Sequence, residues 1–258
     1  MSAEQEPKTM SLRPLPRLIF ASRWLQLPLY LGLIAAQGVY VVHFLLELLH
    51  LIEAAFGSKT ALDAFGGIDI IVNNAGYTWD NVLQKMSDEQ WEAMLAVHMT
   101  APFRILRAAS GFIREAAKRE AEAGTPKHRK VVNISSTSGV YGNAGQANYA
   151  AAKAGINGLT KAMAKEWGRY KVNVNSVAFG LIMTRLTQAL TAGDASVDIG
   201  GRTIAVGVQP DRLQAAEATI PLGRGGTPEE AAGAVYMFCI PESNYVSGQV
   251  LVCGGGRP

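Results

Sequence analysis

Residues 67–76 read Gly-Ile-Asp-Ile-Ile-Val-Asn-Asn-Ala-Gly, a short β-branched run that passes directly into a turn. A continuous apolar run of this length, bounded by turn residues, is typical of a parallel strand that is buried on both faces. Comparable runs occur at residues 130–136, 172–178 and 249–252. We therefore expect these four segments to be strands of one sheet.

Helix signals lie between the expected strands. A capping box at residues 87–90 opens a long helix towards Ala121, and a second helix is expected over residues 146–168. A third begins at residues 227–230, where a threonine N-cap precedes a proline and two glutamates. This alternation predicts an α/β fold with a doubly wound, Rossmann-like parallel sheet. Residues 185–220 show neither pattern, and we expect a long irregular insertion there that shapes a substrate pocket.

The first part of the chain has a different composition. No charged side chain stands between Arg23 and Glu47, and the apolar run over residues 24–46 is 23 residues long. As a helix it would span a hydrocarbon core about 30 Å thick. Polar residues and a proline interrupt the run, so a buried helix of a soluble protein is the alternative. We expect residues 1–52 to form a tail with a long apolar helix that contacts a membrane, and residues 53–258 to form the second domain.

Composition and charge narrow the function. The chain of 258 residues is 48% hydrophobic and 17% charged, values that fit a packed core and exclude a disordered protein. A net charge of +3 is too small to indicate a nucleic-acid surface. Cys239 and Cys253 lack metal-ligand spacing with the four histidines, so we expect reduced core cysteines and no metal site.

A phenol and an ammonium stand four residues apart in Tyr149-Ala150-Ala151-Ala152-Lys153, and therefore on one face of a helix. Tyrosine ordinarily titrates near pH 10, and a nearby cation lowers that pKa, so that the phenol can act as an acid–base catalyst. Ser136 ends an expected strand, at the edge where open α/β sheets bind ligands. Its hydroxyl would bind a carbonyl or alcohol oxygen close to the phenol.

Further motifs occur along the chain in a fixed order. They are Asn73-Asn74-Ala75-Gly76, the run Gly142–Tyr149, the residues Gly180, Ile182 and Thr184, and the segments Pro221–Arg224 and Gly248–Leu251. With Ser136, Tyr149 and Lys153, these motifs make residues 53–258 resemble the short-chain dehydrogenase/reductase superfamily, most closely its 3-oxoacyl-carrier-protein reductase type. Residues 11–52 instead resemble the first span of an uncharacterised family of bacterial inner-membrane proteins.

The first resemblance implies an NAD(P)-dependent oxidoreductase that reduces a small-molecule carbonyl, 3-oxoacyl-like, to an alcohol, or runs the reverse reaction. Tyr149 would donate or accept the proton, Ser136 would orient the substrate oxygen, and Lys153 would bind the nicotinamide ribose and lower the pKa of Tyr149. The residues implied for NAD or NADP are Asn74, Ala75, Gly76, Tyr149, Lys153, Gly180, Ile182 and Thr184. The resemblance also implies a cytoplasmic homo-oligomer; the inner membrane is the alternative location, through residues 24–46.

Two substitutions depart from the family pattern. His98 stands where the family has an asparagine whose backbone carbonyl holds a proton-relay water. Because Pro102 cannot donate to the carbonyl of residue 98, His98 could serve in the same way and is a fourth catalytic candidate. Phe179 replaces a proline before Gly180 and should reshape the nicotinamide pocket.

The third departure is a loss. The family's Gly-rich turn, Thr-Gly-x-x-x-Gly-x-Gly, holds the cofactor pyrophosphate, and nothing before Asn73 matches it. We therefore expect an N-terminally truncated domain. The alternative function is a non-catalytic relic, membrane-tethered or merely truncated, without a functional dinucleotide site.

Overall fold

The computed structural model describes residues 67–184, 187, 196–199, 202–205 and 210–256. The expected apolar helix over residues 24–46 and the expected domain boundary at residues 52–53 lie outside this part of the chain. Among the described residues, no helix is both long enough and apolar enough to cross a membrane.

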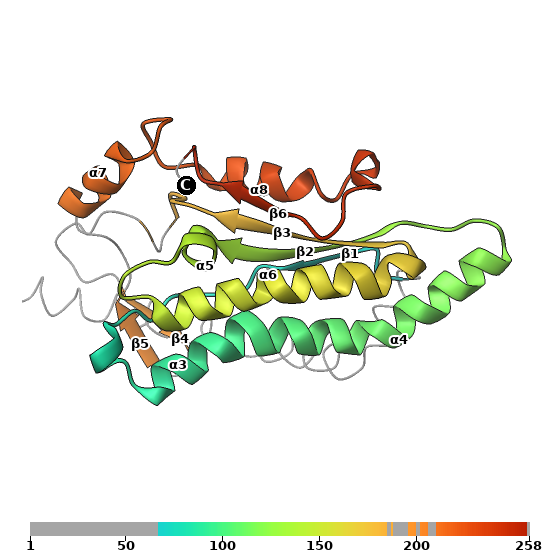
Figure 1. The fold of residues 1–258 in the computed structure, drawn as a ribbon, viewed down its shortest axis with the longest axis horizontal. Coiled ribbons are helices and arrows are strands. Elements are labelled where there is room, and N and C mark those ends of the chain that lie inside the picture. The colour runs from blue at the N-terminus through green and yellow to red at the C-terminus, as the bar shows by residue number, and fades with distance from the viewer. Residues whose placement is uncertain (1–66, 185–186, 188–195, 200–201, 206–209, 257–258) are drawn as a thin grey trace, which may run out of the picture. The chain divides into compact units, whose positions relative to one another are not determined.

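One parallel sheet organises the described residues (Figure 1). Its strands, in spatial order, are β1 (Ile70–Asn73), β2 (Arg129–Ser136), β3 (Val172–Phe179) and β6 (Val250–Cys253). Every neighbouring pair is parallel, and the register places Asn73 beside Asn133 and Ser136 beside Phe179. The parallel sheet expected from the sequence is confirmed, and the carboxyl ends of its strands share one edge.

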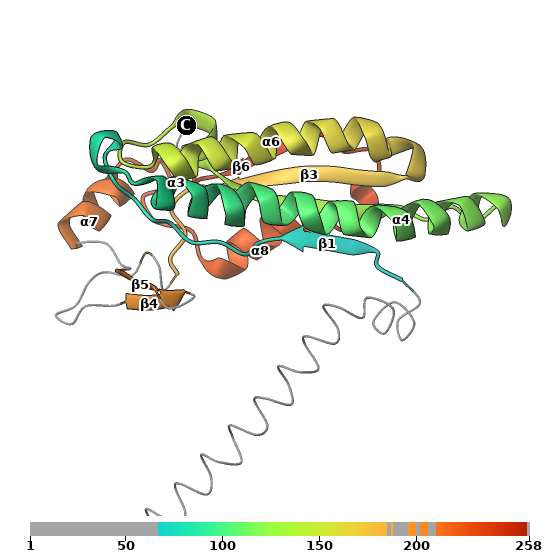
Figure 2. The same cartoon turned by 90° about the horizontal axis from the view of Figure 1, so that it is seen from below.

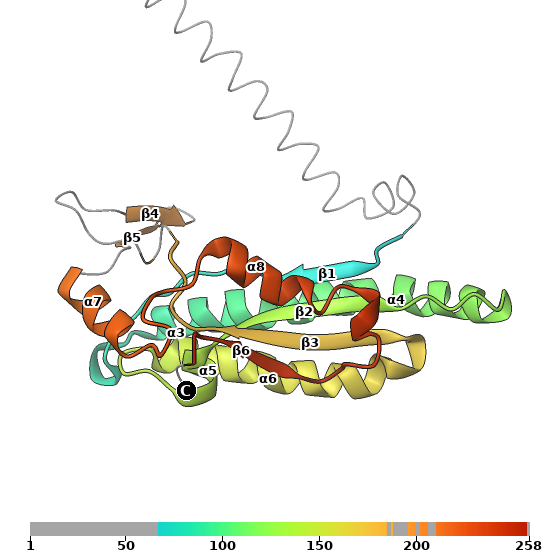
Figure 3. The same ribbon diagram turned by 90° about the horizontal axis from the view of Figure 1, so that it is seen from above.

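Helices cover both faces of this sheet. The described helices are α3 (Asp88–Leu95), α4 (Ala101–Glu122), α5 (Thr137–Tyr141), α6 (Ala147–Trp167), α7 (Pro210–Ala218) and α8 (Pro228–Tyr236), with short 3-10 turns at Leu83–Lys85, Gly168–Tyr170 and Pro241–Ser243. Three of them, α4, α6 and α8, pack on the sheet. Val131 of β2 packs in one cluster with Leu106 of α4 and Trp167 of α6. Its neighbour Val132 packs in a second cluster with Ala234 of α8. Since successive strand side chains point to opposite faces, α4 and α6 cover one face and α8 the other, as Figures 1 and 3 show.

Strand β1 forms one border of the sheet. In the described part of the chain it pairs with β2 alone, and Figure 2 shows it at the margin of the ribbon. Ile70 and Val72 of β1 are 49% and 43% exposed, whereas β2 is buried along its whole length. An apolar, unpaired border at this position is what a truncation on the N-terminal side of the sheet predicts.

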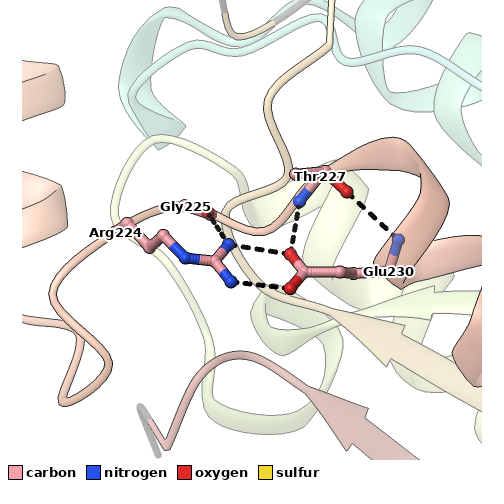
Figure 4. A network of polar contacts seen from close by, with 4 residues as sticks. All are labelled: Arg224, Gly225, Thr227 and Glu230. Carbon is pink, nitrogen blue, oxygen red and sulfur yellow. Dashed lines mark hydrogen bonds and ion pairs between the residues drawn. The ribbon is translucent and has the colours of Figure 1, made fainter.

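Two capping boxes begin helices where the sequence predicts them. At α3, Ser87 Oγ accepts from the Gln90 N–H at 3.2 Å, and Gln90 Oε1 accepts from the Ser87 N–H at 3.1 Å. At α8, Thr227 and Glu230 exchange the same two bonds, and Arg224 grips the Glu230 carboxylate at 2.6 and 2.8 Å (Figure 4). Both boxes satisfy N–H groups that the first turn of a helix leaves unpaired.

The long helix expected from residues 87–90 towards Ala121 is interrupted. A π-turn, η2 (Ala96–Thr100), separates α3 from α4, and the Ala101 N–H donates to the carbonyl of Ala96. Pro102 supplies a physical reason, because it has no N–H to donate to the carbonyl four residues before it, and the regular ladder cannot pass unbroken through this turn.

The expectation of an irregular insertion over residues 185–220 is wrong for the described residues of that range. β4 (Ser196–Ile199) and β5 (Arg202–Ala205) form an antiparallel hairpin, and α7 begins at Pro210. Strands of four residues are too short to show a readable alternation. Proline is common in the first turn of a helix, so Pro210 is a sequence signal for the start of α7.

An ion pair joins the end of α4 to the beginning of β2. Arg129 donates to both carboxylate oxygens of Glu120, at 2.6 and 3.0 Å. The two side chains are only 5% and 16% exposed. The hydrogen bonds from Arg129 hold the pKa of Glu120 below its usual range. Asp69 lies farther away, 3.7 Å from the Arg129 Nε, so Glu120 is the nearer of two carboxylates that balance the charge of the buried guanidinium.

We expect Glu120→Gln to lower the free energy of unfolding by about 2 kcal/mol at pH 7, because the buried guanidinium loses the nearer of its two counter-charges and keeps only Asp69. The folded-state pKa of Glu120 is lowered, so the contribution of the pair is present above the ordinary carboxyl pKa and is lost as the pH falls through the lowered value. Urea unfolding at pH 7 and at acidic pH measures both effects.

Glu122→Gln is the matched control, since Glu122 is 66% exposed and lies 3.9 Å from Lys118. Its effect should stay within about 0.5 kcal/mol. Equal losses for the two variants would contradict the special role of the buried pair.

Candidate active site

Ser136 lies where β2 reaches the carboxyl edge of the sheet. Its side chain is 7% exposed, and its Oγ accepts a hydrogen bond from the N–H of Ser138 at 3.1 Å, which caps α5. The extended backbone of β2 therefore ends at a fixed hydroxyl. The structure places this predicted site residue at the edge where it was expected.

Tyr149 and Lys153 stand one turn apart near the beginning of α6. The Lys153 Nζ lies 5.5 Å from the centroid of the Tyr149 ring, and it donates to the carbonyl of Ile134 at 2.7 Å. Ser135 Oγ donates to the backbone carbonyl of Lys153 at 2.9 Å. These two bonds fasten α6 to β2, so the phenol, the ammonium and the serine come together.

A glycine makes the approach of α5 to α6 possible. A Cβ built on Gly139 would lie 2.5 Å from the backbone carbonyl carbon of Lys153. No side chain fits at such a distance, so the backbone of α5 lies directly against the helix that carries Lys153.

The protonation equilibria of the site are set chiefly by burial. Burial lowers the pKa of Lys153 to about 8. Burial raises the pKa of Tyr149, a side-chain hydrogen bond with Ser136 opposes that rise, and the charge of Asp80 adds to it. We expected Lys153 to lower the pKa of Tyr149; the net shift of Tyr149 in the structure is upward, and burial is its largest cause. The physical reason is that the phenol lies in a poorly solvated site beside an acidic side chain.

His98 lies on the π-turn η2 and is 3% exposed. Its Nε2 is 2.7 Å from the carbonyl oxygen of Tyr77. Its ring meets the ring of Tyr149 edge-on, with centroids 5.0 Å apart and an interplanar angle of 89°. Burial lowers the pKa of His98 to about 4, the charge of Lys153 adds to the lowering, and the bond to Tyr77 opposes it. The structure thus brings the fourth predicted residue to the phenol through its side chain.

The residues expected at the cofactor follow two strands that flank β2. Asn74, Ala75 and Gly76 form an exposed turn directly after β1. Gly180, Ile182 and Thr184 follow β3. A Cβ on Gly180 would lie 2.9 Å from the Cα of Gly254, so the segments after β3 and β6 touch backbone to backbone. Because the strands are parallel, both groups lie at the edge that carries Ser136.

One polar network beside the site is not predicted from the sequence. Gln146 Nε2 donates to Asp80 at 2.7 Å, and Gln146 Oε1 accepts from Ser138 Oγ at 2.8 Å and from Asn143 Nδ2 at 3.0 Å. Partial desolvation of its carboxyl group raises the pKa of Asp80, although the residue as a whole is exposed. Asp80 lies 66 residues before Gln146 in the chain, and no local sequence pattern connects the two.

Two family models match the chain. The model described as enoyl-(acyl carrier protein) reductase covers residues 52–257. A second model, of the uncharacterised protein family UPF0114, covers residues 19–74. The two matches fit the two resemblances found in the sequence, and they overlap across β1.

Curated relatives agree with the first match. The 3-oxoacyl-acyl-carrier-protein reductase FabG of Vibrio cholerae is 39% identical over 198 residues, which cover 77% of this chain and 70% of the relative. The reductase of the same name from Thermotoga maritima is 36% identical over 199 residues, covering 77% and 69%. The 3-oxoacyl-acyl-carrier-protein reductase of Synechocystis is 38% identical over 199 residues, covering 77% and 68%.

The matched residues include the whole sheet and every predicted site residue. By the extent and identity of these matches, the chain belongs to the short-chain dehydrogenase/reductase superfamily of oxidoreductases, in the 3-oxoacyl-acyl-carrier-protein reductase family.

Proposed function

We propose that this chain is an NAD(P)-dependent oxidoreductase that reduces the carbonyl of a 3-oxoacyl-type thioester to an alcohol, or runs the reverse reaction. One observation carries the proposal: a phenol, an ammonium and a serine hydroxyl converge at the carboxyl edge of the sheet, with Lys153 Nζ 5.5 Å from the centroid of the Tyr149 ring and the Ser136 hydroxyl close enough to oppose the rise in the pKa of Tyr149. The 3-oxoacyl-acyl-carrier-protein reductases that resemble this chain support the substrate class.

The described residues fit the nicotinamide half of a dinucleotide. The Lys153 ammonium has three N–H groups, one of which donates to Ile134, and the Tyr149 hydroxyl lies on the same helix face. Such a donor set suits the hydroxyls of a ribose. The turn Asn74–Gly76 and the segment Gly180–Thr184 would hold the adenine-ribose side and the carboxamide. The sequence offers no match for the family's pyrophosphate turn.

When bound, the nicotinamide would supply or accept the hydride. Tyr149 would donate its phenolic proton to the substrate oxygen, since a raised pKa keeps the phenol protonated at neutral pH. Ser136 would donate a hydrogen bond to the same oxygen and fix its position. Lys153 remains largely charged at pH 7 and would stabilise the negative charge left on the phenol.

A homo-oligomer belongs to the same proposal. Phe103 and Ile105 of α4 are 46% and 48% exposed, which leaves large apolar side chains on a helix that already covers the sheet. A second copy of the chain packed against α4 and α6 would remove them from water.

The second candidate function is a relic that has lost cofactor binding. The missing Gly-rich turn favours it, because pyrophosphate contacts are charge-assisted and several of them together contribute several kcal/mol. The unpaired border at β1 points in the same direction within the described residues. Cofactor binding therefore separates the two candidates.

We expect NADH or NADPH to quench the intrinsic fluorescence of the full chain saturably, with a Kd weaker than that of intact relatives by at least about tenfold because the pyrophosphate contacts are lost. Lys153→Ala should weaken the quenching further, whereas Lys165→Ala, on an exposed position of the same helix, should not. A chain that shows no quenching at millimolar cofactor would be the relic.

Tyr149→Phe should lower kcat for the reduction of acetoacetyl-coenzyme A by about 100-fold or more. The unfolding midpoint should stay unchanged, because the substitution removes only the titratable hydroxyl. Steady-state assays with NADH and NADPH measure the loss. Tyr141→Phe is the control, since Tyr141 is 55% exposed. Turnover by Tyr149→Phe at the rate of the control would refute the assignment.

The proposed role requires a charged Lys153 in a buried position, and this charge should cost stability. Its folded-state pKa is about 8, below the ordinary 10.5, so the penalty is full below pH 8 and fades as the pH rises towards 10.5. Lys153→Met should therefore be more stable than the wild type at pH 7 by about 2 kcal/mol, after the loss of the bond to Ile134.

Urea unfolding of both proteins from pH 7 to 10.5 measures this difference. The advantage of Lys153→Met should shrink steadily over that range, and Lys165→Met should show no such trend. If the difference in free energy of unfolding between Lys153→Met and the wild type stays constant with pH, burial does not lower the pKa of Lys153.

A further inference from the structure

We propose that the imidazole of His98 is a positioning residue for Tyr149, joining the turn after β1 to the helix that carries the phenol. The inference rests on the function proposed above and deepens it. It differs from the role expected from the sequence, in which His98 acts only through its backbone carbonyl.

The first support is a fixed ring orientation. The Nε2 of His98 lies 2.7 Å from the carbonyl oxygen of Tyr77. A carbonyl oxygen only accepts, so Nε2 carries the hydrogen of this bond. The bond ties η2 to the residue that directly follows the turn Asn73–Gly76, on the side of the site where the cofactor would bind.

The second support is the contact with the phenol. The ring of Tyr149 meets the imidazole edge-on at 5.0 Å, an arrangement that aromatic pairs favour. The ammonium of Lys153 lies 5.5 Å from the centroid of the same phenol ring. The phenol is therefore located by two groups, of which only Lys153 belongs to its own helix.

The third support is the lack of space around the imidazole. A Cβ on Gly76 would lie 2.3 Å from the His98 Cε1, so the imidazole extends to the backbone of the turn. The next residue, Met99, fits against Gly155 of α6, where a Cβ would lie 2.8 Å from its sulfur. The π-turn η2 therefore contacts both the turn at Gly76 and the helix α6 at Gly155, and the imidazole ring has little freedom to move.

The fourth support is the unpaired nitrogen. The Nδ1 of His98 is buried and has no hydrogen-bond partner. A buried acceptor without a donor is destabilising. A phenylalanine would fill the same space and would carry no unpaired nitrogen. The imidazole is the side chain that combines a flat ring against Tyr149 with a donor for Tyr77. Because its pKa is lowered to about 4, it does this as a neutral ring at pH 7.

Three substitutions separate the ring from the donor. His98→Gln keeps a donor for Tyr77 and removes the ring, His98→Phe keeps the ring and removes the donor, and His98→Asn shortens the side chain. In each full-length variant, the ionisation of Tyr149 is followed by ultraviolet titration at 295 nm against the same variant carrying Tyr149→Phe. This measurement needs neither cofactor nor turnover.

We expect the pKa of Tyr149 to fall in His98→Gln and His98→Asn, because the phenol gains solvent where the ring was, and to stay close to the wild-type value in His98→Phe. If the chain reduces acetoacetyl-coenzyme A, kcat should fall at least tenfold in His98→Gln and His98→Asn, while KM stays within twofold of the wild-type value. His98→Phe should retain at least a third of the wild-type kcat. An unchanged titration of Tyr149 in both ring-less variants would overturn the proposal, whether or not the wild type is active.

Gly76→Ala covers the case in which a His98 variant does not fold. Its added methyl must displace the imidazole, so it should also shift the titration of Tyr149, and His98→Asn in the same chain should remove that additional shift. A Gly76→Ala protein that folds and titrates as the wild type does would equally overturn the proposal. Absence of turnover in the wild type, with these titration shifts present, would count against the proposed function alone.

Discussion

The hydrogen bond from the Lys153 ammonium to the carbonyl of Ile134, at 2.7 Å, fastens the helix of the phenol to the strand of the serine. With the bond from Ser135 to the Lys153 carbonyl, it sets the height of α6 above the sheet. Ser136 ends the same strand, and Gly139 lets α5 lie against the same helix. The group that would serve the chemistry thus also makes a contact between helix and strand, although burial of its charge costs more than this contact returns.

Much of the fold could be predicted because its signals are local. The β-branched run at residues 70–73 and the capping box at Ser87 depend on neighbours in the sequence, as does the spacing of Tyr149 and Lys153 on one turn. The direction of the Tyr149 pKa could not be predicted, because it depends on burial by residues far along the chain and on Asp80, which no motif connects to the phenol. The side-chain role of His98 was hidden for the same reason. Its two partners, Tyr77 and Tyr149, lie on either side of it in the sequence at no regular spacing.

The two family matches overlap at residues 52–74, which include β1. This strand has the sequence of an interior strand and, among the described residues, the position of a border strand. Ile70 and Val72 lie two residues apart and therefore on one face of β1, and it is this face that the described helices leave exposed, whereas Ile71 on the other face packs against the core cluster of α4 and α6. Ser136 stands on β2, the strand with which β1 pairs, and Tyr149 and Lys153 stand on α6, which packs on β2 and β3.

The π-turn at Ala96–Thr100 adds a residue to one helical turn, and each residue of a helix corresponds to a rotation of about 100°. The turn therefore sets the angular phase of α4 relative to α3. In this phase Leu106 and Ile113 face the sheet while His98 faces the phenol. Substitutions inside the turn change one contact at a time. A single-residue insertion or deletion there would rotate the whole of α4 by about 100° and turn Leu106 and Ile113 away from the sheet.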